Sequence, residues 1–146
     1  MKLSPHFTLA EMTVSQEAAR SGLKNIPNQV HVQALTQLCM SVLEPLRMRV
    51  RTPIVVSSGF RSVSVNRRIG GSSKSQHCKG EAADFTIPGM SVADIVALTR
   101  TMRLPYDQLI DEFGQWVHVS YSTTGIQRGQ VLTARRKAGK TVYSPA

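Results

Sequence analysis

The sequence has no apolar run of about 18 residues, the length that a membrane-spanning helix requires. Residues 1–6 include no apolar segment of the kind found in secretory signals, so we expect synthesis in a cytoplasm. Charged residues make up 18% of the chain and hydrophobic residues 41%, which is typical of a globular protein. The 146 residues fit one domain, and we expect a single domain over residues 1–146 with no membrane partner.

Cysteine and aromatic residues are scarce. The two cysteines, Cys39 and Cys78, are too few for a disulfide framework, so we expect both to be reduced. Cys39 lies in an apolar helical stretch and is predicted to be a small core residue. Aromatic residues make up 5% and do not alternate with basic residues, as a stacking platform for nucleic acid would require. We therefore expect no nucleic-acid partner.

Acidic residues are also few: nine against 18 basic residues, for a net charge of +9. Such a balance favours anionic partners. The basic residues fall into three groups, Arg47/Arg49/Arg51, Arg67/Arg68 and Arg135/Arg136/Lys137/Lys140. Ordinary surface charge explains such groups most simply, and attraction to an anionic cell wall is the alternative, with the last group as the candidate.

The order of predicted elements is helices first and strands later. Apolar residues at helical spacing predict a helix from Asn28 that Pro45 kinks or ends. A short helix up to about Arg20 is predicted after two capping-box spacings, Thr8–Glu11 and Thr13–Gln16, and further short helices are predicted through Asn66 and from Ser91. Strands are predicted over residues 54–58, 82–87, 108–112, 116–121, 131–134 and 141–143. This order predicts an α+β fold, with a small antiparallel sheet and helices packed on one side.

Two histidines and an aspartate are candidate metal ligands: His77, Asp84 and His118. A catalytic zinc site takes three such nitrogen and oxygen ligands and keeps a fourth position open. An aspartate inside an apolar strand is costly to bury unless a cation or an arginine neutralises it. Strand alternation places His118 opposite the core-facing Val117 and Val119. Taken singly, each histidine could equally be an ordinary loop or strand residue.

A metal hydrolase also needs a general base. If the turn after the strand at 108–112 has three residues, Glu112 pairs with Trp116 and shares the face of His118. With a two-residue turn, Asp111 would take that place. We prefer Glu112, and interpret Asp107 as a turn residue.

Three further residues are candidates for contact with a substrate. Arg61 follows a strand and could stabilise an oxyanion, although it could also be an ordinary surface arginine. Ser75 could bond a substrate or a ligand, and Trp116 could form a wall of the cleft. Gln76 and Cys78 are interpreted as bystanders.

The spaced motif Ser75-x-His77-x-x-Gly80-x-Ala82-x-Asp84 with Trp116-Val117-His118 resembles that of the zinc D-Ala-D-Ala carboxypeptidases and peptidoglycan endopeptidases. This group, metallopeptidase family 15, shares the Hedgehog/DD-peptidase fold. Further stretches resemble its compact branch from phages and prophages: residues 3–11, 42–47, 57–62, 70–72 and 107–110.

The resemblance implies a Zn²⁺ cofactor held by His77, Asp84 and His118, and an arginine at Arg61 that steadies the transition state. It also implies a serine at Ser75. Many relatives carry the catalytic acid three residues before the last histidine, where this chain has Gln115. In the compact branch an acid before the turn takes that role, which is consistent with Glu112.

The implied activity is hydrolysis of an amide bond in peptidoglycan stem peptides or cross-links, of carboxypeptidase or endopeptidase (endolysin) type. The alternative is a non-catalytic cell-wall or protein-binding module on the same fold. We expect a monomer, made in the host cytoplasm, that reaches the wall after release by a pore or as part of a virion.

Overall fold

The computed structural model describes residues 1–146, which form helices and strands. The helices are α1 (Gln16–Ser21), α2 (Gln29–Leu38), α3 (Glu44–Val50), α4 (Val63–Arg68) and α5 (Val92–Thr101). The strands are β1 (Lys2–Ser4), β2 (Phe7–Thr8), β3 (Val55–Ser58), β4 (Ala82–Thr86), β5 (Gln108–Glu112), β6 (Trp116–Ser120), β7 (Gln130–Lys137) and β8 (Lys140–Pro145). None of the helices is long and apolar enough to cross a membrane.

Six strands form the main sheet, in the order β3-β4-β6-β5-β7-β8, while β1 and β2 pair separately. The α+β prediction is confirmed. The sheet is antiparallel except at β5 and β7, which run parallel. That pair was not predicted, because the chain between β6 and β7 gives no sequence signal for the direction in which β7 joins the sheet.

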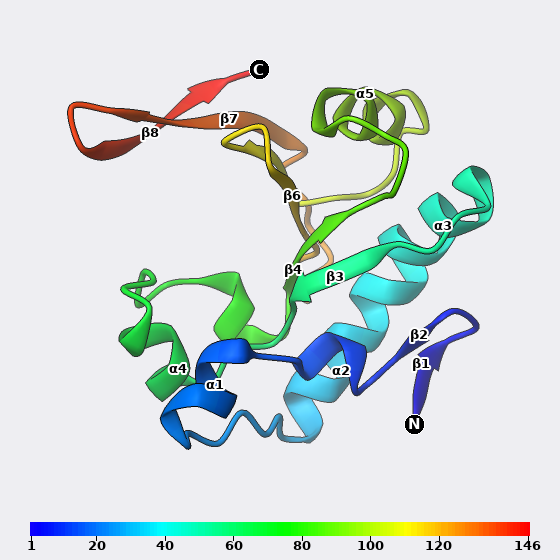
Figure 1. Ribbon diagram of the computed structural model, residues 1–146. Coiled ribbons are helices and arrows are strands. Elements are labelled where there is room, and N and C mark those ends of the chain that lie inside the picture. Colours follow the sequence, from blue (N-terminus) through cyan, green and yellow to red (C-terminus); the bar gives the residue numbers. More distant parts are fainter.

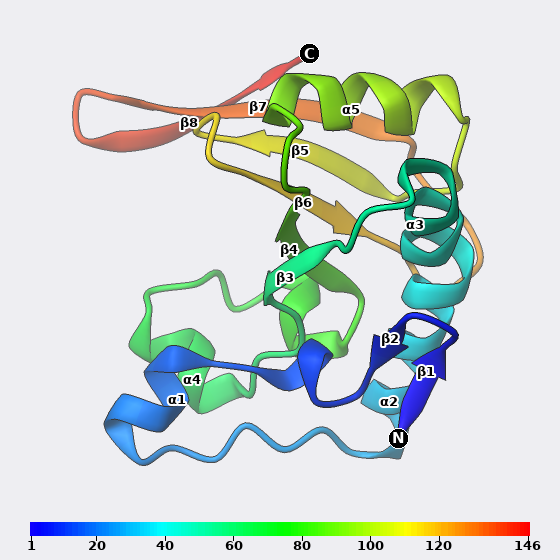
Figure 2. The same cartoon turned by 45° about the vertical axis from the view of Figure 1, so that its right-hand side comes forward.

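Helices cover one face of the sheet (Figures 1 and 2). Leu35 and Leu38 of α2 lie in one apolar cluster with Ile95 of α5 and with Val117 and Val119 of β6. All five side chains are fully buried. The core therefore lies on the valine face of β6, as predicted, and the opposite face is left for the site.

The helix that begins after Asn28 does not end at Pro45, but its α-helical hydrogen bonding is interrupted directly before that residue. Asn28 caps α2 in a reciprocal capping box with His31. The turn before α3, Cys39–Leu43, widens into a π-helix, and Pro45 falls in the first turn of α3. Pro45 lacks the N–H that would bond to the preceding turn, so the change in hydrogen-bond pattern lies next to the proline while the helical path continues beyond it. Cys39 is fully buried, as predicted.

The two capping-box spacings near the N-terminus precede different elements. Thr8 and Glu11 bond reciprocally, but around an isolated 3-10 turn, Glu11–Thr13. The helix α1 begins only after Ser15, whose hydroxyl accepts from the Ala18 N–H. The predicted short helix up to Arg20 is thus confirmed as α1, and it follows the second of the two spacings.

Candidate metal centre

His77 is held in place by its backbone and by one carbonyl. It lies on a 3-10 helix, Gln76–Lys79, where the Ser75 hydroxyl accepts from the His77 N–H at 3.2 Å. Its ring Nδ1 donates to the Gly59 carbonyl at 2.7 Å, and the side chain is buried. A Cβ at Gly59 would lie 2.3 Å from the carbonyl oxygen of Met12, so only glycine fits there. This arrangement leaves Nε2 of His77 as the free nitrogen.

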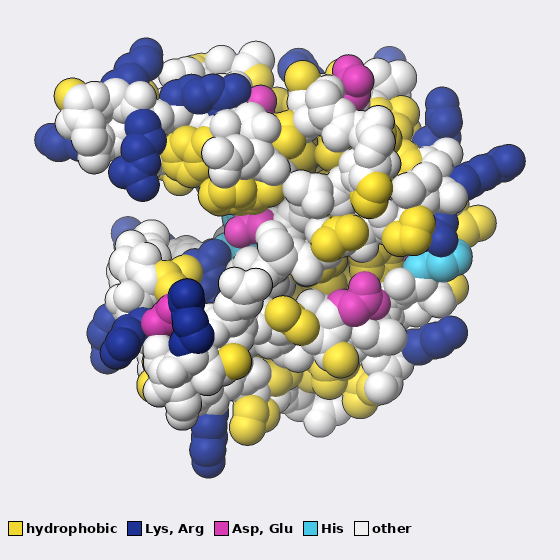
Figure 3. Space-filling view, viewed as in Figure 1, with side chains coloured by type: hydrophobic (Ala, Val, Ile, Leu, Met, Phe, Trp, Pro, Cys, Tyr) yellow, Lys and Arg dark blue, Asp and Glu magenta, His cyan; other side chains and the backbone are white.

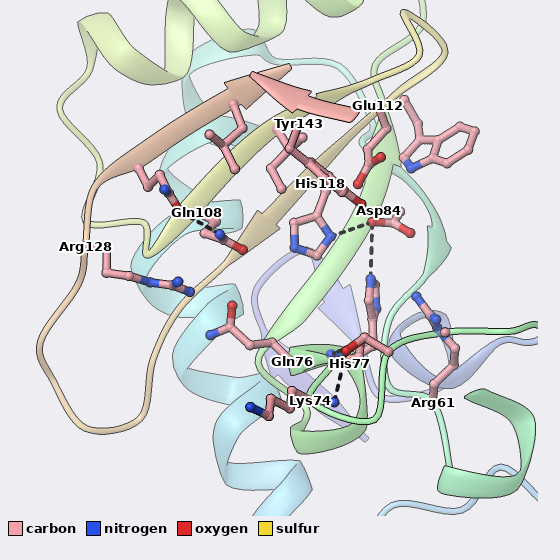
Figure 4. A pocket seen from close by; sticks show the side chains of 17 residues that line it. Arg61, Lys74, Gln76, His77, Asp84, Gln108, Glu112, His118, Arg128 and Tyr143 are labelled. Atoms are coloured by element: carbon pink, nitrogen blue, oxygen red, sulfur yellow. Dashed lines mark hydrogen bonds and ion pairs between the residues drawn. The ribbon is translucent and has the colours of Figure 1, made fainter. Parts of the chain in front are cut away.

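Asp84 and His118 lie directly opposite each other on β4 and β6. His118 Nδ1 is 2.9 Å from Asp84 Oδ1, and His77 Nε2 is 3.3 Å from the same oxygen. Gly80 makes the turn that leads from His77 into β4: its φ is +74°, and a Cβ would lie 2.6 Å from the His31 carbonyl oxygen. Sheet pairing and a tight turn therefore bring the three predicted ligands together (Figure 4).

The three side chains fit a metal ion. Their ligand atoms all lie within 4.8 Å of one another. Burial lowers the pKa of His77 despite the opposing effect of Asp84, so its ring is neutral at pH 7. A neutral ring that donates through Nδ1 directs the lone pair of Nε2 at a carboxylate oxygen, and a cation between them removes that repulsion. Two imidazoles and one carboxylate form the donor set of a catalytic zinc site.

The charge of Asp84 is compatible with this role. Burial by itself raises the pKa of Asp84, but the charges and hydrogen bonds of His77 and His118 outweigh burial and hold that pKa well below its usual range. Asp84 is therefore ionised at neutral pH. The alternative partner considered from the sequence, an arginine, makes no hydrogen bond to it.

The β5–β6 hairpin places the two candidate bases, Glu112 and Asp111, in different surroundings. Glu112 pairs with Trp116 across a three-residue turn, as predicted. It lines the same cleft as His77, Asp84 and His118, called here the metal-ligand group. Burial first, and then the charge of Asp84, raise the pKa of Glu112. Asp111 instead accepts from both Nη atoms of Arg135, at 2.9 and 3.2 Å, and from the Gly114 N–H. Asp111 thus stabilises the turn, and Glu112 is the acid available in the cleft.

Arg61 lies next to His77, on the side of the cleft away from Arg128 (Figure 4). Its backbone N–H donates to the His77 carbonyl at 3.0 Å, and its Nη1 donates to Asn66 Oδ1 at 2.9 Å. Its Nε is buried and has no hydrogen-bond partner. Burial lowers the pKa of Arg61, while the charge of Asp84 opposes that shift. A guanidinium with an unused N–H beside the ligands is suited to a developing negative charge.

The remaining predicted residues have mixed outcomes. Ser75 and Trp116 both line the cleft, and Trp116 packs edge-on against Phe113 with ring centroids 5.7 Å apart. The interpretation of Gln76 as a bystander is wrong: it lines the cleft, and its amide donates to Asp107 Oδ2 at 3.0 Å. Asp107 is buried and paired with Arg128, so it is more than a turn residue.

The cleft itself has a volume of about 660 Å³ and is visible as a notch on one side of the molecule (Figure 3). One wall comes from the end of the chain, through Arg128, Gln130, Leu132 and Tyr143. Sequence reasoning missed all four. Their position depends on the parallel pairing of β7 with β5, for which the sequence carries no local signal.

A histidine–aspartate–histidine group with an acid and an arginine in one cleft is compatible with a metallohydrolase site. Residues 5–120 match the family model described as Peptidase M15, which covers most of the chain. The protein belongs to the peptidase M15 family and is a peptidase of the metallopeptidase type. No curated protein matches the sequence. Residues 121–146 lie outside the family match.

Proposed function

We propose that the protein is a zinc-dependent peptidase that hydrolyses an amide bond in peptidoglycan stem peptides or cross-links. The observation that carries the proposal is the group of His77, Asp84 and His118 in one cleft with Glu112 and Arg61. The spaced motif supports the substrate class, because it resembles that of peptidoglycan carboxypeptidases and endopeptidases. An available acid in the cleft favours catalysis over a non-catalytic binding module.

The residues that line the cleft have distinct roles in this hydrolysis. His77, Asp84 and His118 would hold zinc, which when bound polarises the scissile carbonyl and makes water more acidic. Glu112 takes the proton from the attacking water and passes it to the leaving amine. The guanidinium of Arg61 donates to the oxyanion that forms on the carbonyl. The Ser75 hydroxyl keeps His77 in position by accepting from the His77 backbone N–H.

The direct test is digestion of purified peptidoglycan by the zinc-loaded protein, with the products identified by mass spectrometry. We expect new amino and carboxyl termini at one type of peptide bond, because the cleft presents one metal-ligand group. Removing zinc with a chelator should abolish the cleavage, and added zinc should restore it. A zinc-loaded protein that cleaves no stem peptide or cross-link would contradict the proposal.

The proposal extends to where the protein acts. We infer that it works as a monomer, reaches the wall through a membrane pore or as part of a virion, and binds no nucleic acid. A lytic or virion role follows from the resemblance to the compact phage branch.

The basic hairpin of β7 and β8 is a candidate for wall attachment. Arg135 is paired with Asp111, so the sequence-based group reduces to Arg136, Lys137 and Lys140, which are exposed and have no acidic partner. We expect the triple variant R136Q/K137Q/K140Q to bind teichoic-acid-bearing walls several-fold more weakly than the parent, since each lost cation removes attraction to the polymer. Sedimentation with walls at low and high salt measures the effect.

A matched control is available on α3 and at Arg51, the residue that follows it. The variant R47Q/R49Q/R51Q removes the same charge from a surface that does not line the cleft. It should bind walls nearly as the parent does. Equal weakening by both triple variants would show that net charge alone matters, and unchanged binding in the hairpin variant would exclude this attachment role.

A further inference from the structure

The cleft has a second charged end, away from the metal-ligand group. Lys74 and Arg128 line it, whereas the two acids that line the cleft are Asp84 and Glu112. Figure 4 shows Arg128, Gln76 and Lys74 on one side of the cleft, and Asp84, Glu112 and Arg61 toward the other. The proposed hydrolysis uses none of the residues at this second end.

Arg128 is held rigidly for an exposed arginine. The buried carboxylate of Asp107 accepts from its Nε at 3.0 Å, its Nη2 at 2.8 Å and its backbone N–H at 2.8 Å. Gln76 donates to the same carboxylate at 3.0 Å. Asp107 therefore has a donor for each of its lone-pair directions, and it acts as a support behind the guanidinium.

The outer edge of that guanidinium is unused. Nη1 of Arg128 has no hydrogen-bond partner, and the Arg128 side chain is 56% exposed. Lys74 is exposed and has no acidic partner, while the Ser72 hydroxyl fixes its backbone by accepting from the Lys74 N–H at 3.1 Å. Glu81, the other buried acid nearby, accepts from the backbone and side chain of Thr123. Its other oxygen accepts from the Gln76 amide at 3.3 Å, so both oxygens already have donors within the protein.

A pre-oriented arginine and a free lysine that line the same cleft suit a carboxylate, which the arginine can bind through charge-assisted hydrogen bonds and the lysine can attract. We propose that Arg128 and Lys74 form a carboxylate-binding subsite, and that the enzyme selects peptides with a free carboxylate near the scissile bond. The inference rests on the proposed function and specifies its substrate class. Arg128 lies beyond residue 120, so the subsite depends on a segment that the family match does not cover.

The test measures binding separately from turnover. The probes are the peptide L-Ala-D-isoGlu-L-Lys-D-Ala-D-Ala and two forms of it, each with one free carboxylate converted to an amide. Calorimetry on the zinc-loaded full-length Glu112→Gln variant gives Kd without cleavage, and the parent protein gives kcat/KM. We expect one of the two amidations to weaken binding about tenfold, the order of magnitude for loss of one hydrogen bond to a charged group.

Arg128→Gln should bring the ratio of acid to amide affinity close to one, and Lys74→Gln should reduce it in part. Arg49→Gln, which removes an exposed arginine outside the cleft, should leave the ratio unchanged. The ratio is informative because general loosening of the fold would weaken acid and amide alike, and Lys74→Gln breaks no contact in the structure.

The outcomes separate this inference from the proposed function. Three results would overturn the carboxylate subsite. The first is equal affinity for the acid and amide peptides when Arg128 and Lys74 are both present. The others are an acid-to-amide affinity ratio that Arg128→Gln leaves unchanged, and no binding of any probe. Selective binding without any cleavage by the parent protein would retain the subsite and overturn the peptidase function on these peptides. Cleavage of acid and amide peptides without selectivity would retain the peptidase function and overturn the subsite.

Discussion

Replacing Glu112 with glutamine is expected to lower kcat for stem-peptide hydrolysis by about a hundredfold to ten-thousandfold, the range for loss of a general base. Zinc content should stay at the parent level, because Glu112 makes no hydrogen bond to His77, Asp84 or His118. The amide keeps the shape of the side chain and cannot accept a proton. Steady-state kinetics on a stem peptide and metal analysis of the same preparation measure the two effects.

The neighbouring acid provides the control. Asp111→Asn keeps Glu112 in the cleft and weakens the bonds to Arg135 and Gly114. This variant should melt at a lower temperature than the parent and retain most of its kcat. If Asp111→Asn lost catalysis and Glu112→Gln retained it, the assignment of the base would be reversed, since the two residues point to opposite faces of β5.

The second large effect is expected for His118→Ala, which should remove both zinc and hydrolysis. The parent should carry about one zinc per chain, as a site with three protein ligands does. The variant keeps only His77 and Asp84, and two ligands hold zinc far more weakly than three. Metal analysis after dialysis measures this loss, and activity should fall to the level of the chelated parent.

His6→Gln is the matched control, because His6 bonds Glu44, far from the cleft. It should retain zinc at the parent level. A chelator should lower the melting temperature of the parent and of His6→Gln but not that of His118→Ala. Parent-level zinc in His118→Ala would exclude His118 as a ligand, and a folded parent that takes up no zinc would remove the basis of the mechanism.

The sequence alone predicted the group of candidate ligands, and there is a physical reason for that success. His77, Gly80 and Asp84 are close in the chain, so a turn and a strand are enough to relate them. Because successive side chains of a strand point to opposite faces, His118 faces away from Val117 and Val119 whichever strand pairs with β6. The length of one hairpin turn then distinguished Glu112 from Asp111.

Other features were decided only by the tertiary structure. The Gly59 carbonyl that orients His77 belongs to a distant segment, and the contact depends on backbone packing against Met12. The ion pair of Asp107 and Arg128 forms because β7 joins β5 in parallel, and no local pattern encodes that choice. The chain by itself thus determined the group of three candidate metal ligands through short-range geometry. The charged far end of the cleft was decided by long-range strand pairing.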